Sequence, residues 1–173
     1  MNQKKDSIRQ LILGCGNKKT KHPENKMWFD VVTVDIDSTC NPDICYDLNK
    51  FPYPFDDNEF DEVHAYEILE HLGSQGDYIS FFNLFNEVWR IMKKDSILYF
   101  TTPLWNSLWA WSDPGHTRII SEGSIAFLSQ KEYEKQIGIT SMTDYRRLYH
   151  GDFEVLQCVN FTNSLYCKMR CIK

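Results

Sequence analysis

The stretch Leu11–Asn17, LILGCGN, joins a short apolar run to two glycines that are one residue apart. An apolar run that stops at Gly-x-Gly is typical of a buried β-strand followed by a tight turn. Glycine suits such a turn because it adopts positive φ and lets a ligand approach the backbone closely. By itself the motif indicates either a plain strand-to-helix turn or a ligand-binding turn.

Strand and helix patterns alternate after this turn. Strands are predicted at 31–34 (VVTV), 60–66 (FDEVHAY) and 97–103 (ILYFTTP), with a short strand-like stretch at 43–48 (DICYDL). The segment EILEHL predicts a short helix that Gly73 ends, and residues 77–92 predict an amphipathic helix capped by Asp77 and ended by 93–96.

The last third of the chain is a long loop at 104–120, helices starting at Ser121 and Ser129, and two strands around Thr162 and Asn163. Strands that alternate with helices imply right-handed crossovers and a parallel sheet. The sequence therefore predicts an α/β, doubly wound, mostly parallel Rossmann-like sheet with an antiparallel C-terminal hairpin. The length and the absence of repeats predict a single domain over residues 1–173.

Composition narrows the function classes. The formal net charge is −5 and the basic residues are mostly scattered, so strong nucleic-acid binding is not expected. The N-terminus resembles neither a signal peptide nor a membrane span, which predicts a cytoplasmic protein that does not contact membranes. Six cysteines without a CxxC pair are expected to be free and mostly buried thiols. The oligomeric state stays open.

Asp35 ends the predicted strand 31–34 and lies 21 residues after Gly14. At this spacing a carboxylate can accept hydrogen bonds from both ribose hydroxyls of a nucleoside, the alternative being a solvated strand end. A dinucleotide site requires a third glycine where Lys19 stands. This disfavours a nicotinamide-dependent oxidoreductase.

Four segments together resemble the successive motifs of class I S-adenosylmethionine-dependent methyltransferases, particularly the compact type-11 group. They are LILGCGN, VVTVDID, CYDLNKFPYPFDDNEFDEV and AYEILEHL, and the resemblance runs from Leu11 to Pro103. It implies S-adenosylmethionine as cofactor and methyl transfer to an O or N atom of a small-molecule or nucleotide-like acceptor. A non-catalytic scaffold or partner subunit with the same fold is the alternative.

The resemblance also implies a set of cofactor-binding residues. The methionine part would be lined by Gly14, Cys15 and Gly16, the ribose held by Asp35 beside Ile36, the adenine by Asp47 and the backbone of Leu48, and the floor formed by Ala65, Tyr66 and Glu67. The family's acidic residue ahead of the first glycine is absent, since Ile12 and Leu13 occupy that stretch.

His116, in DPGHTR, and His71 are the candidate catalytic residues, because imidazole titrates near neutrality and can take a proton from an acceptor. Alternatively, His116 could have a structural role and hold its loop in place. On a helix Glu67, Glu70 and His71 would share a face and, with His116, could hold a divalent metal. A similar ExxEH occurs in metal-dependent O-methyltransferases of RNA ends and quinone precursors, but LEH is common in type-11 enzymes without metal, so no metal ligand is assigned.

Two further groups of residues lie outside these motifs. Trp105, Trp109 and Trp111 could stack on a flat acceptor, cover the sheet edge or form a partner interface. The run 144–147, DYRR, could bind an anionic group or be a solvated charge cluster.

Overall fold

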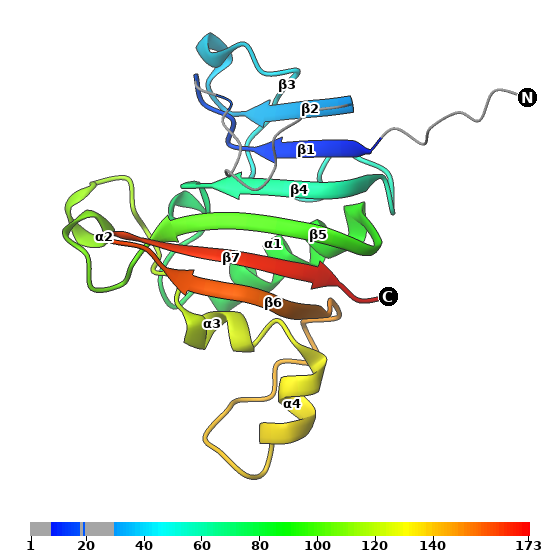
Figure 1. The fold of residues 1–173 in the computed structure, drawn as a ribbon, viewed down its shortest axis with the longest axis vertical. Coiled ribbons are helices and arrows are strands. Elements are labelled where there is room, and N and C mark those ends of the chain that lie inside the picture. The colour runs from blue at the N-terminus through cyan, green and yellow to red at the C-terminus, as the bar shows by residue number, and fades with distance from the viewer. Residues whose placement is uncertain (1–7, 18, 20–29) are drawn as a thin grey trace, which may run out of the picture.

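The chain folds around one mixed sheet, which in the described part has seven strands in the order β3-β2-β1-β4-β5-β7-β6 (Figure 1). The computed structural model describes residues 8–17, 19 and 30–173. The strands are β1 (Arg9–Leu13), β2 (Asp30–Asp35), β3 (Ile44–Cys45), β4 (Phe60–Tyr66), β5 (Met92–Pro103), β6 (Phe153–Asn160) and β7 (Ser164–Cys171). The segment that follows the glycine turn, at 18 and 20–29, lies outside the described residues.

The pairing of the strands confirms the predicted fold class. β1 pairs in parallel with both β2 and β4, and β4 pairs in parallel with β5. β7 is antiparallel to β5 and β6, so the C-terminal hairpin forms the antiparallel edge. The chain leaves β1 toward β2 and β3, then returns to place β4 on the other side of β1. The switch point of the sheet is therefore between β1 and β4.

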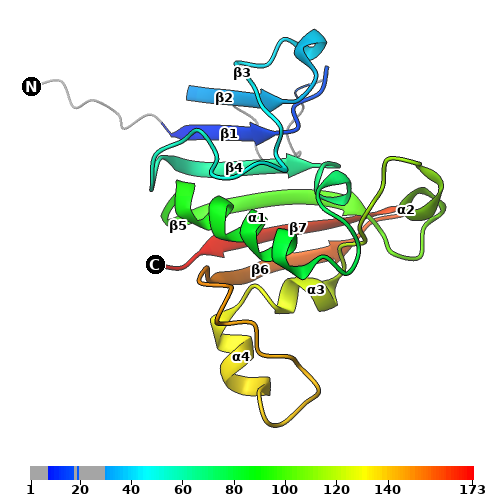
Figure 2. The same ribbon diagram turned by 180° about the vertical axis from the view of Figure 1, so that it is seen from behind.

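The amphipathic helix is confirmed as α1 (Tyr78–Ile91), and the Asp77 carboxylate caps it by accepting a bond from the Ser80 N–H. Figure 2 shows α1 lying across the sheet. The residues that it buries are Phe81, Phe82, Leu84, Phe85, Val88 and Ile91. They pack with Leu11, Val63, Leu98 and Phe100 of the strands in the hydrophobic core.

Two element predictions were wrong in detail. Residues 93–96 do not separate α1 from the next strand, because β5 starts at Met92 and carries them, with Asp95 at φ 61° and a register shift opposite Phe60 and Glu62. The 104–120 loop contains a helical turn, α2 (Leu108–Ser112), capped by the Ser107 hydroxyl. A helix cap made by one hydroxyl and an irregularity within a strand produce no repeating pattern of apolar residues, so the sequence did not indicate either feature.

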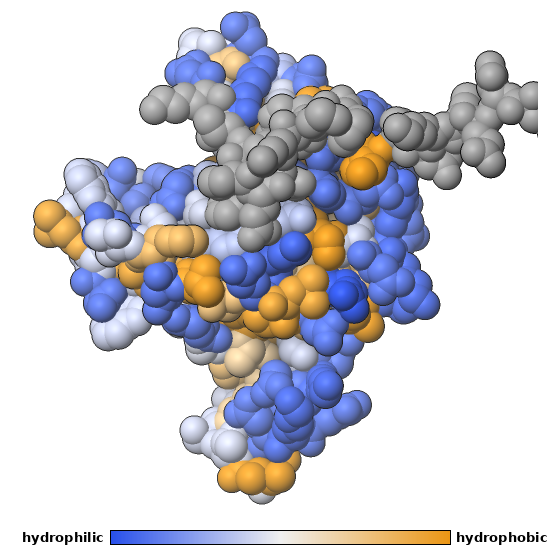
Figure 3. Space-filling view, viewed as in Figure 1, coloured by the Kyte–Doolittle hydropathy of each residue, from blue (hydrophilic) through white to orange (hydrophobic). Residues whose placement is uncertain are grey.

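The helices predicted from Ser121 and Ser129 are α3 (Glu122–Ala126) and α4 (Gln130–Gln136), which follow one another below β6 in Figure 1. Figure 3 shows hydrophobic residues gathered in a band across β6 and β7, next to the hydrophilic surface of α4. Among the described residues no helix is both long and apolar enough to cross a membrane.

The cysteines are free, as predicted, but only Cys15, Cys167 and Cys171 are buried. Cys40 and Cys158 are half-buried and Cys45 is exposed. Half of the thiols thus lie outside the core, because the short β3 and the edge strand β6 leave side chains partly open.

Asn86 ties α1 to the segment that leads into β6. Its Nδ2 donates to the Leu148 carbonyl at 2.8 Å, and its Oδ1 accepts from the N–H groups of His150 and Gly151 at 2.9 and 3.1 Å. One amide thereby satisfies three backbone groups of a segment that has no regular structure of its own.

We expect Asn86→Ala to lower the free energy of unfolding by about 1–3 kcal/mol, because it leaves these backbone groups without their partner. Urea denaturation followed by circular dichroism measures the change. Asn83→Ala, on an exposed position of the same helix, is the matched control. Equal losses in the two variants would contradict the role of the Asn86 amide.

Candidate functional site

A cavity of about 230 Å³ opens at the carboxyl ends of β1 and β2, beside the switch point. Ligands of open α/β sheets bind at this position. Of the residues predicted to bind the cofactor, the cavity is lined by Gly14, Asp35, Ile36, Asp47 and Leu48. Its other lining residues are Tyr46, Asn49, Ile68, His71 and Leu72. The structure thus brings together the carboxylates and the first glycine that the sequence placed in one site.

Gly14 cannot carry a side chain in this arrangement. Its φ is 64°, and a Cβ built on it would lie 2.5 Å from Cγ1 of Ile68. Ile68 comes from the loop after β4, so this contact joins the two sides of the switch point. Glycine is required here because Ile68 packs closely against the Gly14 backbone and because the turn needs positive φ.

Asp35 closes the glycine turn. Its Oδ2 accepts from the Gly16 N–H at 2.8 Å, and its Oδ1 accepts from the Asp37 N–H at 3.0 Å. An ionised carboxylate has about four lone-pair positions, so it can still accept bonds from a ligand. Asp35 therefore fixes the turn, and its bond to a ribose remains a prediction.

Asp47 and Leu48 form the wall on the β3 side of the cavity. Asp47 Oδ1 accepts from the Asn49 N–H at 3.0 Å, and the Lys50 ammonium lies 3.9 Å from Oδ2. The buried Tyr53 hydroxyl donates to the Leu48 carbonyl at 3.0 Å. These local bonds hold the Asp47 carboxylate at the cavity edge.

Four predicted cofactor residues, Cys15, Gly16, Tyr66 and Glu67, do not line this cavity. The Tyr66 hydroxyl is 2.8 Å from Nδ1 of His64, which stacks on the Tyr99 ring. Tyr66 thus belongs to a set of polar and aromatic side chains that are in contact on strands β4 and β5. Its contact with a cofactor stays a prediction.

The predicted helix at EILEHL is only one 3-10 turn, η2 (Leu69–His71). Glu67 has a φ of 52°, in the left-handed region, and Ile68 has a φ of −130°, so neither can belong to an α-helix. The prediction that Glu67, Glu70 and His71 share a helical face was therefore wrong. The Ile68–Gly14 contact requires this departure from helical geometry.

The structure nevertheless gathers Glu70, His71 and His116, whose ligand-type atoms lie within 4.8 Å of one another. The loop at 115–118 is pinned to η2, because the Glu70 carbonyl accepts from the N–H groups of Thr117 and Arg118 at 2.9 and 3.1 Å. The two imidazole rings meet edge to face, with centroids 4.7 Å apart. We refer to Glu70, His71 and His116 as the Glu–His cluster.

The tautomer of His71 follows from its partner. Nδ1 lies 3.0 Å from the Gly115 carbonyl, which can only accept, so Nδ1 carries the proton and Nε2 has a free lone pair. His71 also lines the cavity at the switch point, which we call the cofactor cavity after the predicted binding residues in its lining. It therefore connects the cavity to the Glu–His cluster.

Glu70 is the unusual member of the cluster. Its residue is 2% exposed, and neither carboxyl oxygen forms a hydrogen bond within the described residues. The pKa of Glu70 is raised to about 8, chiefly by burial and in smaller part by the nearby Glu67 charge. His116 Nδ1 is likewise buried without a partner, and its Nε2 is 4.0 Å from Glu70 Oε1 and 3.8 Å from Asp113 Oδ2.

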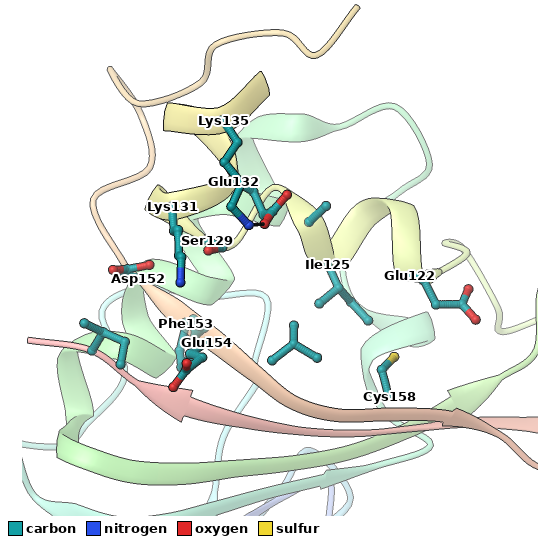
Figure 4. Close-up of a pocket in the computed structure, with 13 residues that line it drawn as sticks. Glu122, Ile125, Ser129, Lys131, Glu132, Lys135, Asp152, Phe153, Glu154 and Cys158 are labelled. Carbon is teal, nitrogen blue, oxygen red and sulfur yellow. Dashed lines mark hydrogen bonds and ion pairs between the residues drawn. The ribbon is translucent and has the colours of Figure 1, made fainter. Parts of the chain in front are cut away.

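A separate hollow of about 560 Å³ lies between α3, α4 and β6 (Figure 4). The ion pair between Lys135 and Glu132 stands on its rim, and the apolar side chains of Ile125 and Phe153 are in its lining. No residue of the predicted site lines it. Its position away from the switch point separates it from the cofactor cavity.

Comparison with solved structures identifies the fold. A SAM-dependent methyltransferase from Archaeoglobus fulgidus is similar with a TM-score of 0.60 and 16% identity, over 96% of this chain and 87% of that one. The chain has a class I methyltransferase fold. The N-methyltransferase NodS from Bradyrhizobium japonicum WM9 is similar with a TM-score of 0.57 and 12% identity, over 96% and 87% of the two chains, and has also been solved with S-adenosyl-L-homocysteine.

The same fold also serves another chemistry. The cyclase SpnF is similar with a TM-score of 0.58 and 12% identity, over 95% of this chain and 75% of that one. No family model and no curated protein sequence matches the chain. At these identities the similarity establishes the methyltransferase fold, and the activity has to be argued from the site.

Sequence reasoning missed Ile68, Asn49 and Tyr46 of the cavity. Ile68 carries no motif signal, since any branched apolar residue fits its pattern, and its importance appears only in the contact with Gly14. Asn49 accepts from the Gly73 N–H at 2.8 Å, which links the Asp47 side of the cavity to the segment after η2.

We expect the metal-free protein to lose stability as the pH rises from about 4.5 toward 8, through Glu70. In this range the unfolded chain has released the Glu70 proton, while the folded chain keeps it because burial raises the pKa to about 8. Thermal unfolding in a chelating buffer measures the slope, which Glu70→Gln should flatten.

Glu132→Gln is the matched control. Bonds from Lys135 and Gln136 lower the pKa of this carboxyl, so its contribution is constant above pH 5. A slope unchanged in Glu70→Gln would contradict the assignment.

Proposed function

We propose that this chain transfers a methyl group from S-adenosylmethionine to an O or N atom of a small-molecule or nucleotide-like acceptor. The observation that carries the proposal is His71, which lines the cofactor cavity and belongs to the Glu–His cluster. Acid/base groups therefore adjoin the place where the fold binds its cofactor. The methyltransferase fold of the described residues supports the same conclusion.

The chemistry requires positioning more than a nucleophile on the protein. The sulfonium loses its positive charge as the methyl leaves, and the acceptor atom must approach in line with the carbon–sulfur bond. The acceptor's proton has to leave during or after the attack. In our proposal His71 Nε2, which has a free lone pair, or His116 accepts that proton.

Glu70 sets the charge of this environment. With its pKa raised to about 8, Glu70 is mostly uncharged near pH 7 in the absence of a cation. Neutral imidazoles are the form that can accept a proton. The cluster is thus suited to general-base work on a hydroxyl or amine.

A divalent cation is a second feature that we propose for the Glu–His cluster, because its donor set fits one. The two Glu70 oxygens are buried without hydrogen bonds in the described structure, His116 Nε2 lies 4.0 Å from Glu70 Oε1, and His71 offers a ring nitrogen to the same cluster. One carboxylate and two imidazoles suit Mn²⁺, Fe²⁺ or Zn²⁺. A cation bound there would occupy the lone pairs of these imidazoles in place of the proton, and it would instead promote the reaction by lowering the pKa of an acceptor hydroxyl that it coordinates.

The first test is cofactor binding. We expect the wild-type chain to bind S-adenosyl-L-homocysteine in isothermal titration calorimetry, and Asp35→Ala to weaken binding at least about tenfold, since charge-assisted hydrogen bonds are lost. Asp56→Ala removes an exposed carboxylate elsewhere and is the control. A folded wild-type chain that binds neither S-adenosylmethionine nor its product would contradict the proposal.

Turnover separates the enzyme from a cofactor-binding scaffold. Methyl-labelled S-adenosylmethionine is incubated with fractionated pools of small molecules and nucleotides. We expect label to move to an acceptor with wild type and to fall at least about a hundredfold with His71→Ala, in line with the size of general-base catalysis. Tight cofactor binding without transfer in any pool would favour the scaffold.

The cation is tested by titrating Mn²⁺ into the chelator-stripped protein at pH 8. We expect one site in wild type and at least tenfold weaker binding in Glu70→Gln, because the buried carboxylate is lost. His150→Ala, an exposed histidine outside the cluster, should bind Mn²⁺ like wild type. Identical binding by Glu70→Gln and wild type would exclude the cluster as the site.

A further inference from the structure

Two adjoining hollows, of about 450 and 570 Å³, lie beyond the Glu–His cluster. They share Gln75, Ile119 and Ser121 in their linings, so they form one continuous depression. Its aromatic walls are Trp105 and Trp111 at one end and Tyr78, Phe127 and Tyr145 at the other. We call this depression the aromatic groove.

The chain segment at 116–119 links the cluster to the aromatic groove, whose lining includes Arg118 and Ile119. The Gln75 N–H donates to the Thr117 carbonyl at 2.8 Å, and Gln75 Oε1 accepts from the Ile119 N–H at 2.9 Å. Thr117 follows His116, and its own N–H donates to the Glu70 carbonyl at 2.9 Å. The segment at 116–119 therefore runs from the reactive end of the site into the groove.

Of the charged residues that line the groove, Asp77 and Arg118 are engaged in hydrogen bonds, and the exposed Glu122 lies at the end where Trp105 and Trp111 stand. The Arg118 residue is 6% exposed, and its Nε and Nη2 donate to the carbonyls of Leu72, Ser74 and Asp77. The Asp77 carboxylate caps α1. Between Asp77 and Arg118 a charged tail would find no unpaired partner, whereas a neutral apolar body would meet the aromatic faces at both ends of the groove.

Three of the aromatic residues that line the groove are exposed to solvent and are not packed into the core. Trp105 is 54%, Trp111 72% and Tyr78 42% exposed, yet Trp111 is held in place because its Nε1 donates to the Trp105 carbonyl at 2.7 Å. Large aromatic residues kept exposed beside a reactive cluster are typical of ligand-binding surfaces.

From this geometry we propose that the acceptor is amphipathic. Its O or N head lies at the Glu–His cluster, and a neutral aromatic or alkyl extension occupies the aromatic groove. The proposal rests on the proposed methyl transfer and names the class of its acceptor. It assigns Trp111 and Tyr78 to acceptor selection and gives them no part in binding the cofactor.

The probes are 4-alkylphenols of increasing chain length, titrated into the full chain in the presence of S-adenosyl-L-homocysteine. Burying one methylene contributes roughly 0.8 kcal/mol, about fourfold in affinity. We expect the dissociation constant to fall at least about tenfold from 4-ethylphenol to 4-hexylphenol. In Trp111→Ala and Tyr78→Ala this gain should shrink to about threefold or less.

Leu108→Ala is the matched control, because Leu108 is 73% exposed on α2 but does not line the groove. The position of the head is read from the histidine ring resonances in the same titration. We expect His116 to shift with 4-hexylphenol and the exposed His150 to stay unchanged.

Affinity that is independent of chain length, or equal losses in Trp111→Ala and Leu108→Ala, would overturn the assignment of the groove. An unmoved His116 resonance would overturn the placement of the head. Calorimetry with S-adenosyl-L-homocysteine alone separates the two ideas. Binding of alkylphenols without binding of S-adenosyl-L-homocysteine would contradict the proposed methyl transfer. Binding of S-adenosyl-L-homocysteine without binding of alkylphenols would contradict only the amphipathic acceptor.

Discussion

The contact between Ile68 and Gly14 is the constraint on which the rest of the site depends. It joins the turn after β1 to the loop after β4, and it leaves no room for a Cβ at Gly14. To reach this position the chain takes a left-handed conformation at Glu67, which prevents an α-helix from following β4 directly. The 3-10 turn that forms instead directs His71 toward the cofactor cavity. A single apolar contact thus sets both the floor of the cavity and the first residue of the Glu–His cluster.

Burial of Glu70 is the second organising feature, and it is energetically unfavourable for the fold. A carboxyl without hydrogen bonds in the interior stays protonated or requires a cation, because the charged form is poorly solvated there. Its backbone carbonyl meanwhile anchors the loop that carries His116. The same residue therefore positions the loop through its main chain and determines the local charge through its side chain. Unsatisfied buried polar groups of this kind concentrate at functional sites.

The sheet and the cofactor side of the site could largely be predicted from local patterns. Apolar runs, the glycine turn and the spacing of Asp35 depend on neighbours in the sequence or on the strand period, and the structure confirms the mostly parallel sheet with an antiparallel C-terminal hairpin that they imply. The cavity contains Gly14, Asp35, Asp47 and Leu48 as expected. The α1 helix was predictable for the same reason, since its apolar face and its Asp77 cap lie within one continuous segment.

The sequence by itself determined the α/β fold, the amphipathic helix and the residues that meet in the cavity at the glycine turn, because short-range periodicity and turn chemistry specify them. Only the tertiary structure decided that Glu67 leaves the helical path, that His116 meets Glu70 and His71, and that Trp105 and Trp111 wall a groove beside them. Those outcomes depend on hydrogen bonds between distant segments, such as those that the Arg118 guanidinium donates to the Leu72, Ser74 and Asp77 carbonyls. Long-range hydrogen bonds and side-chain packing leave no periodic signal in a single sequence, so the chemistry of the acceptor side emerged only once the chain was folded.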